Sequence, residues 1–140
     1  MRMRTQIFAV VALVSCLALV AGCVQAPIPT PADGAVRADE AADGTIVELT
    51  RGAKFVVALK ANPTTGYDWK VIGELPSQLS VVGDSLESTA PAGVVGAGGT
   101  RVFTYRAEAA GTGALDLAYV RAWETGVPPE RTFRLTVVVK

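Results

Sequence analysis

The residues of this 140-residue chain that could do chemistry are few, and histidine is absent. Histidine is the usual general base for serine and cysteine nucleophiles and the commonest ligand of transition metals. Carboxylates remain, but the adjacent pair Asp39 and Glu40 lies outside the strand-like part of the sequence. Zinc sites built from carboxylates alone are rare. We therefore expect no enzymatic activity, no metal and no cofactor.

Cys23 is the residue best placed for covalent modification. It directly follows Ala21 and Gly22, at the end of an apolar run over residues 7–20 that Arg2 and Arg4 precede. A positive start, an apolar run of this length and small residues before a cysteine resemble the lipobox of a bacterial lipoprotein signal. The resemblance implies cleavage after residue 22 and lipidation of the Cys23 thiol. The alternative is an ordinary secretory signal followed by a cysteine.

Removal of residues 1–22 from the 140 leaves 118 residues, enough for one domain with a substantial core. Cys16 leaves with the signal, so no disulfide can form within the domain, which must rely on its hydrophobic core. Loss of Arg2 and Arg4 from the 13 basic residues leaves 11 against 13 acidic ones, a net charge of −2. No basic stripe with interleaved aromatic residues occurs, so we do not expect nucleic-acid binding.

The mature chain divides into a tether over residues 23–42 and a domain over residues 43–140. Alternating prolines at 27, 29 and 31 favour an extended tether. The domain alternates apolar and polar residues with a period of two, which is the signal of half-buried strands. Gly, Pro, Asp and Ser clusters separate the runs. The pattern predicts an all-β, immunoglobulin-like antiparallel β-sandwich of about seven strands, at residues 45–49, 54–60, 67–72, 79–82, 100–107, 114–120 and 131–139.

Three short motifs fall between these runs: Asn62-Pro63-Thr64-Thr65-Gly66, Gly96-Ala97-Gly98-Gly99 and Arg121-Ala122-Trp123-Glu124. Proline restricts the backbone and glycine permits positive φ, so the first motif predicts a stiff exposed loop. The glycines of the second permit close backbone approach to a partner. Tryptophan and arginine in the third are favoured binding anchors. Taken singly, the motifs also fit a plain turn, a flexible linker, and a core-capping tryptophan beside a surface Arg–Glu pair.

Together and in this order, the motifs resemble the signatures of the chagasin family. Asn-Pro-Thr-Thr-Gly-Tyr with Trp69 two residues on is similar to the first signature, and Gly-x-Gly-Gly before Phe103 is similar to the second. Arg-x-Trp-Glu after Leu-x-Leu-x-Tyr is similar to the third. The family usually has proline between the arginine and the tryptophan, where this chain has Ala122, so the resemblance implies a less rigid third loop here.

The resemblance implies an immunoglobulin-like inhibitor of papain-type cysteine peptidases that acts reversibly as a monomer. The loop at residues 62–66 would lie nearest the catalytic cysteine and histidine of the peptidase, with the other two loops along the rims of its cleft. Two alternatives are an immunoglobulin-like adhesion or assembly lipoprotein and a module that binds a small ligand between the loops. Lipidation at Cys23 implies a cell-envelope location, anchored in the outer membrane or on the outer face of the plasma membrane.

Overall fold

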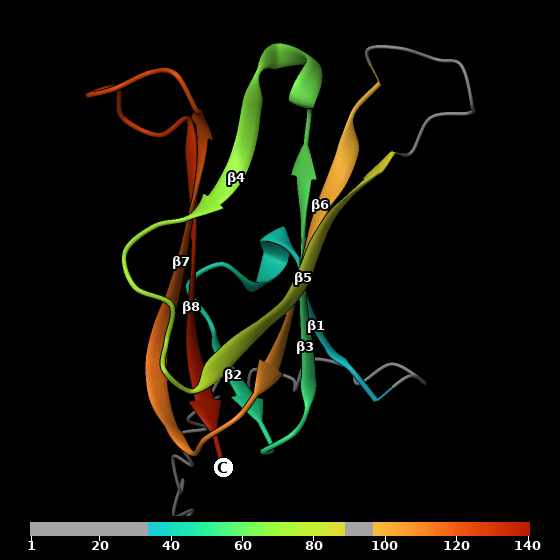
Figure 1. Cartoon of the computed structure of the whole chain (residues 1–140), viewed down its shortest axis with the longest axis vertical. Helices are drawn as coiled ribbons and strands as arrows, with labels where there is room; N and C mark the ends of the chain where they lie inside the picture. Colours follow the sequence, from blue (N-terminus) through green and yellow to red (C-terminus); the bar gives the residue numbers. More distant parts are fainter. Residues whose placement is uncertain (1–33, 89–96) are drawn as a thin grey trace, which may run out of the picture.

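Two four-stranded sheets pack face to face in the computed structural model, which describes residues 34–88 and 97–140 (Figure 1). The first sheet has the order β1 (Val36–Ala38), β3 (Lys54–Ala61), β6 (Gly99–Ala107), β5 (Leu79–Ser88). The second has the order β2 (Ile46–Leu49), β8 (Arg131–Val139), β7 (Gly111–Arg121), β4 (Tyr67–Val71). Two short 3-10 turns, η1 (Glu40–Ala42) and η2 (Pro63–Thr65), complete the described elements. The predicted all-β sandwich is confirmed.

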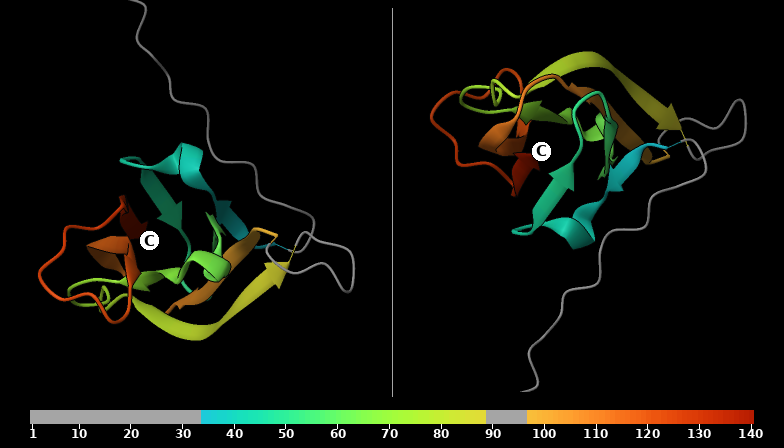
Figure 2. Two further views of the ribbon diagram at one scale, coloured as in Figure 1. Left: turned by 90° about the horizontal axis from the view of Figure 1, so that it is seen from above. Right: turned by 90° about the horizontal axis from the view of Figure 1, so that it is seen from below.

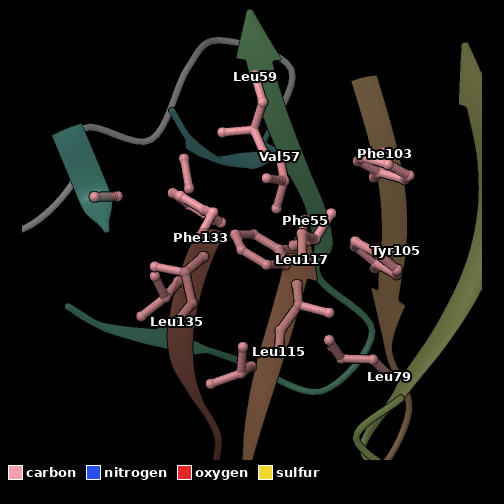
Figure 3. Close-up of a cluster of buried hydrophobic side chains, with 14 of the residues drawn as sticks. Phe55, Val57, Leu59, Leu79, Phe103, Tyr105, Leu115, Leu117, Phe133 and Leu135 are labelled. Atoms are coloured by element: carbon pink, nitrogen blue, oxygen red, sulfur yellow. The ribbon is translucent and has the colours of Figure 1, made fainter. Parts of the chain in front are cut away.

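The core lies between the sheets and is filled by the inward-facing residues of the long strands (Figure 3). Phe55, Val57 and Leu59 of β3 face Leu115 and Leu117 of β7, and all five have no exposed surface. Burying one large apolar side chain contributes about 1.5–3 kcal/mol. These buried side chains stabilise a fold that has no disulfide. They form one core because alternate residues of each strand face the other sheet.

Two edge strands depart from the predicted antiparallel arrangement. β1 pairs with β3 in parallel, and β2 pairs with β8 in parallel, while the other four strand pairs are antiparallel. Parallel neighbours cannot be joined by a tight hairpin. The chain from β1 reaches β3 through η1 and through β2, which lies in the other sheet. All seven predicted runs form strands, and β1 is an eighth strand among the described residues.

The folded part begins earlier than the boundary at residue 43 that the sequence suggested. Ala35, Ala38 and Ala42 are buried, and β1 and η1 lie within the range expected to be tether. The Asp39 carboxylate caps η1 by accepting from the Ala41 amide at 2.9 Å. β1 has only three residues, Val36, Arg37 and Ala38, too few to establish a period of two, which is why the pattern missed this strand. The signal at residues 1–22, the lipidation site Cys23 and the tether up to residue 33 lie outside the described residues.

β5 is longer than predicted and runs on through the residues Gly83, Asp84 and Ser85, which the sequence suggested as a turn. It is an edge strand that curves along one side of the molecule (Figure 2), with a register shift between Val81 and Gly83. Most of its residues are exposed on both faces, so they carry no apolar alternation. Within the described residues, none of the helical turns has the length and apolar character needed to cross a bilayer.

Candidate functional site: three loops at one end of the sandwich

Strand register brings the three predicted loops to the same end of the molecule. The last residue of β3, Ala61, pairs with Gly99, and Tyr67 at the start of β4 pairs with Arg121 at the end of β7. The 62–66 loop therefore leaves one sheet beside the second motif and enters the other sheet beside the third. Figure 1 shows η2, the end of β7 and the start of β6 at the top of the sandwich. Gly96, expected in the second loop, lies outside the described residues.

The 62–66 loop is a closed 3-10 turn. The Gly66 amide donates to the Pro63 carbonyl at 2.9 Å, and Gly66 adopts φ 80°, a left-handed conformation that favours glycine. Both threonine hydroxyls donate to Asn62 at 2.6 Å, Thr64 to its side-chain oxygen and Thr65 to its carbonyl. Pro63, Thr64 and Thr65 are exposed. The loop thus presents a prearranged tip whose hydroxyl protons are already used inside the turn.

Arg121 joins the third loop to the first. Its Nε donates to the Thr65 carbonyl at 3.2 Å, and its Nη1 donates to Glu124 at 3.0 Å. Its guanidinium lies 4.3 Å from the centre of the Tyr67 ring. The hydrogen bond that Arg121 donates to the Glu124 carboxylate raises the pKa of the Arg121 guanidinium. The sequence suggested Arg121 as a rim contact, and within the structure its Nε also holds the first loop through the Thr65 carbonyl.

Trp123 stands at the end of the sandwich with 68% of its surface exposed. The edge of its indole lies against Gly66, where a Cβ atom would come within 2.1 Å of Cη2 of the ring. Trp123 is therefore exposed, as predicted. Its contact with Gly66 joins two loops, which the sequence spacing did not suggest. The core-capping alternative for this residue is wrong.

The glycines of the second loop allow it to pack closely against the backbone of neighbouring strands. A Cβ on Gly99 would lie 2.6 Å from the Glu87 carbonyl oxygen of β5, and one on Gly98 would lie 3.5 Å from the Ala61 carbonyl oxygen. Gly99 is therefore required by its own neighbouring strand. Ala97 and Gly98 remain at the entrance of the loop, with Ala97 half-buried and Gly98 exposed beside the start of the 62–66 turn.

Comparison with known proteins decides the family. A family model described as Chagasin family peptidase inhibitor I42 matches residues 48–137. The chain is 34% identical to chagasin from Trypanosoma cruzi over 104 residues, which are 72% of this chain and 93% of chagasin. This chain belongs to the chagasin family of peptidase inhibitors. It is a non-enzymatic protein.

Solved structures of chagasin-family members share the fold. The crystal structure of the cysteine protease inhibitor EhICP2 from Entamoeba histolytica has a TM-score of 0.66 and 28% identity to this chain, covering 74% of this chain and 94% of that one. The Leishmania mexicana ICP has a TM-score of 0.54 and 32% identity, covering 70% of this chain and 89% of that one.

The departure from the family pattern, Ala122, lies in a tight turn of four residues. The Glu124 amide donates to the Arg121 carbonyl at 3.2 Å, so Ala122 is the second residue of the turn. Proline is favoured at this position of common turns because its fixed φ matches the turn. The backbone of this chagasin-family member thus has the turn that proline would stabilise, although the residue here is alanine.

Two hollows among the described residues bear on the small-ligand alternative. A cavity beside the third loop has a volume of about 10 Å³, which is the space of about one water molecule. A wider open depression of about 390 Å³ lies at the other end of the first sheet, beside Lys54, Ser80 and Arg106. Within residues 34–88 and 97–140, no three His, Cys, Asp or Glu side chains group as a metal site would require.

Proposed function

We propose that this chagasin-family inhibitor of papain-type cysteine peptidases acts by inserting the three loops at one end of the sandwich into the active-site cleft. The observation that carries the proposal is the joint placement of the loops: an exposed Thr64–Thr65 tip lies between Trp123 on one side and Gly98 on the other. An interface of about 1,600 Å² with a few anchors reaches nanomolar affinity. Trp123 is the exposed aromatic anchor.

The 62–66 loop would occupy the cleft without being cut. A peptide bond is attacked when it is held in a geometry close to that of the reaction. Here the segment is a 3-10 turn, with the Thr65 carbonyl bound by Arg121 and the Thr65 hydroxyl donating to Asn62. These contacts hold the loop in its own shape. Inhibition is therefore expected to be reversible and to leave the inhibitor intact.

Titration of the chain against papain tests this proposal. We expect competitive inhibition, with rates extrapolating to the uninhibited value at high substrate concentration, and an inhibitor of unchanged mass after long incubation. A matched pair of variants locates the surface. Thr64→Asp places a charge at the tip and should weaken inhibition more than tenfold, while Ser80→Asp places the same charge at the opposite end of the sandwich and should not. Equal effects of the two charges would contradict the placement of the interface.

We also propose that Cys23 is lipidated and anchors the inhibitor in the cell envelope. Ala21-Gly22-Cys23 supports the modification. The orientation of β1 fits such an anchor, because Val36 pairs with Phe55 near the start of β3, while the 62–66 loop follows Ala61 at its end. Six residues of strand separate these points, or about 20 Å. The chain would thus enter the domain away from the loops and leave them free to meet a peptidase.

Labelling with a radioactive or alkyne fatty acid tests the anchor. We expect wild-type chain to incorporate label and partition with membranes, and Cys23→Ser to accumulate as an unlabelled precursor. Cys16→Ser is the matched control, because that cysteine lies within the apolar run and should leave labelling unchanged. Release of an unlabelled mature chain from wild type would contradict lipidation.

A further inference from the structure

Two backbone atoms just before the 62–66 loop are bound by side chains of the opposite sheet. The Lys60 carbonyl accepts from Trp69 Nε1 at 2.9 Å and from an Arg131 guanidinium nitrogen at 3.0 Å. The Asn62 amide donates to the Tyr119 hydroxyl at 2.8 Å. Lys60 lies in β3 of the first sheet, whereas the three side chains come from β4, β7 and β8 of the second. The strand end that begins the loop is thus tied across the sandwich.

These three side chains form a single row across the second sheet. Trp69 is the register partner of Tyr119, and Tyr119 is the register partner of Arg131. The rings of Trp69 and Tyr119 lie 5.1 Å apart, and the Arg131 guanidinium lies 4.3 Å from the Tyr119 ring and 5.1 Å from the Trp69 ring. Cation–π and ring contacts of this kind favour one arrangement of the side chains. Trp69 and Tyr119 are buried, so the row is held rigidly by the core.

The far end of the loop rests on the same row. Tyr67, the residue after Gly66, stacks on Tyr119 with ring centres 5.3 Å apart, and Arg121 covers the other part of the Tyr67 ring at 4.3 Å. Both ends of the loop therefore depend on Tyr119, through its hydroxyl at Asn62 and through its ring at Tyr67. The Tyr119 hydroxyl thus binds the start of the loop, whereas the ring supports both the core and Tyr67 at the end of the loop.

We propose that Tyr119 and Arg131 are positioning residues of the inhibitor, which fix where the 62–66 loop leaves the first sheet and hence how its tip enters a peptidase. Neither residue lies within the three loops, although Tyr119 is the tyrosine of the Leu-x-Leu-x-Tyr run before the third loop. Neither would touch the peptidase for this role. A loop already fixed in its bound shape loses less conformational freedom on binding, so its affinity is higher. The inference rests on the proposed insertion of the loop into the cleft.

Removal of one oxygen atom tests the role of Tyr119. Tyr119→Phe keeps the ring but removes the acceptor for the Asn62 amide. Tyr105→Phe is the matched control, because the Tyr105 hydroxyl is buried in the core with no hydrogen-bond partner. For each full-length chain in detergent, we would measure hydrogen exchange at the Asn62 amide, the inhibition constant for papain and the melting midpoint. We expect Tyr119→Phe to speed exchange at Asn62 and to weaken inhibition about fivefold, as loss of one hydrogen bond allows.

Arg131 is tested by a second pair. Arg131→Met keeps a long side chain over the rings but cannot donate to the Lys60 carbonyl, whereas Arg51→Met removes the same charge at the β2–β3 turn, at the other end of the sandwich (Figure 1). We expect about fivefold weaker inhibition for Arg131→Met alone, and partial recovery for Arg131→Lys, which retains one donor. Equal effects at Arg51 and Arg131 would mean that charge, not position, matters.

The outcomes separate this inference from the proposed function. If the wild-type chain does not inhibit papain, the proposed function fails, and exchange at Asn62 alone decides whether Tyr119 holds the loop. If wild type inhibits and Tyr119→Phe inhibits equally well, the positioning role is overturned while the proposed function stands. The positioning role is also overturned if Tyr119→Phe speeds exchange at Asn62 but leaves inhibition unchanged, or if its complex with papain dissociates more slowly. Weaker inhibition with faster exchange at Asn62, both absent in Tyr105→Phe, supports it.

Discussion

The indole of Trp123 lies against Gly66, so closely that a methyl group on the Gly66 α-carbon would come within 2.1 Å of Cη2 of the ring. Gly66 closes the first loop and Trp123 projects from the third, so this contact fixes two of the three loops relative to each other. A glycine is needed there for two reasons, its φ of 80° and the room that the ring occupies. The two reasons can be separated by experiment.

Gly66→Ala is expected to weaken papain inhibition more than tenfold. The new methyl group strains the left-handed backbone by about 1 kcal/mol and also displaces the Trp123 ring. Gly73→Ala is the matched control, because Gly73 has φ 74° and open space around its α-carbon. It should show the same backbone strain in its melting midpoint but normal inhibition. In a Trp123→Ala background, Gly66→Ala should weaken papain inhibition less than it does in the wild-type chain. Strictly additive effects of the two substitutions on inhibition would contradict the contact.

Truncation of the two tryptophans is expected to have opposite effects, one on inhibition and the other on stability. Trp123 is 68% exposed and Trp69 is 3% exposed. Trp123→Ala should weaken inhibition about thirtyfold, because truncation of an aromatic anchor costs about 2 kcal/mol, and should leave the melting midpoint nearly unchanged. Trp69→Ala should lower stability by about 3–5 kcal/mol. Inhibition constants and thermal melts of both variants check this, and the reverse outcome would exchange the roles of loop and core.

Ala122→Pro is expected to tighten inhibition modestly. Ala122 is the second residue of the turn closed by the Glu124 amide and the Arg121 carbonyl, and the described non-glycine residues all have negative φ. Proline there reduces the freedom of the unfolded chain and of the free loop, by about 0.4–1 kcal/mol. This corresponds to an inhibition constant about twofold to fivefold lower. A weaker inhibitor with a lower melting midpoint would show that the turn does not accept proline.

The strands were predictable from sequence where one face meets the core. Phe55, Val57 and Leu59 alternate with more polar or smaller residues because only one side of β3 faces the other sheet. β5 does not show this alternation, because Val81 and Val82 are both exposed at a sheet edge beside a bulge. β1 does not show it because three residues paired in parallel leave no period to detect. Edges are therefore the part of the fold that alternation cannot predict.

The candidate site was predictable only where it is local. Asn62 to Gly66 can be recognised in the sequence because proline, two threonines and a glycine build that turn from within. The row of Trp69, Tyr119 and Arg131 could not be, because strand register alone brings these residues together across 62 positions of chain. The contact of Arg121 with the Thr65 carbonyl was likewise hidden, since the two residues lie 56 positions apart. Contacts of this kind follow from the tertiary fold and leave no local signal.

The early start of the domain has a measurable consequence for truncation. A chain that begins at residue 43 loses β1, η1 and three buried alanine methyl groups, at about 0.8 kcal/mol each. It also loses the Glu40 carboxylate, which accepts from the Lys60 amide next to the 62–66 loop. Compared with a chain that begins at residue 34, we expect a melting midpoint lower by about 10 °C and weaker inhibition. Equal midpoints would show that β1 is dispensable.

Stability at alkaline pH is expected to depend on Tyr105. Burial, with a smaller contribution from the nearby Asp84 charge, raises the pKa of the Tyr105 phenol from 10.0 to about 12. The folded state holds this proton more tightly than the unfolded state does, so the contribution is fully present below pH 10 and is lost as pH rises from 10 through about 12. Tyr105→Phe removes a buried hydroxyl that has no hydrogen-bond partner, which costs little or is stabilising. Urea unfolding at pH 7 and at several values between pH 9 and 12 checks this: the wild-type free energy of unfolding should fall more steeply above pH 10 than that of the variant. Parallel pH profiles would mean that the phenol ionises in the folded protein as easily as in the unfolded chain.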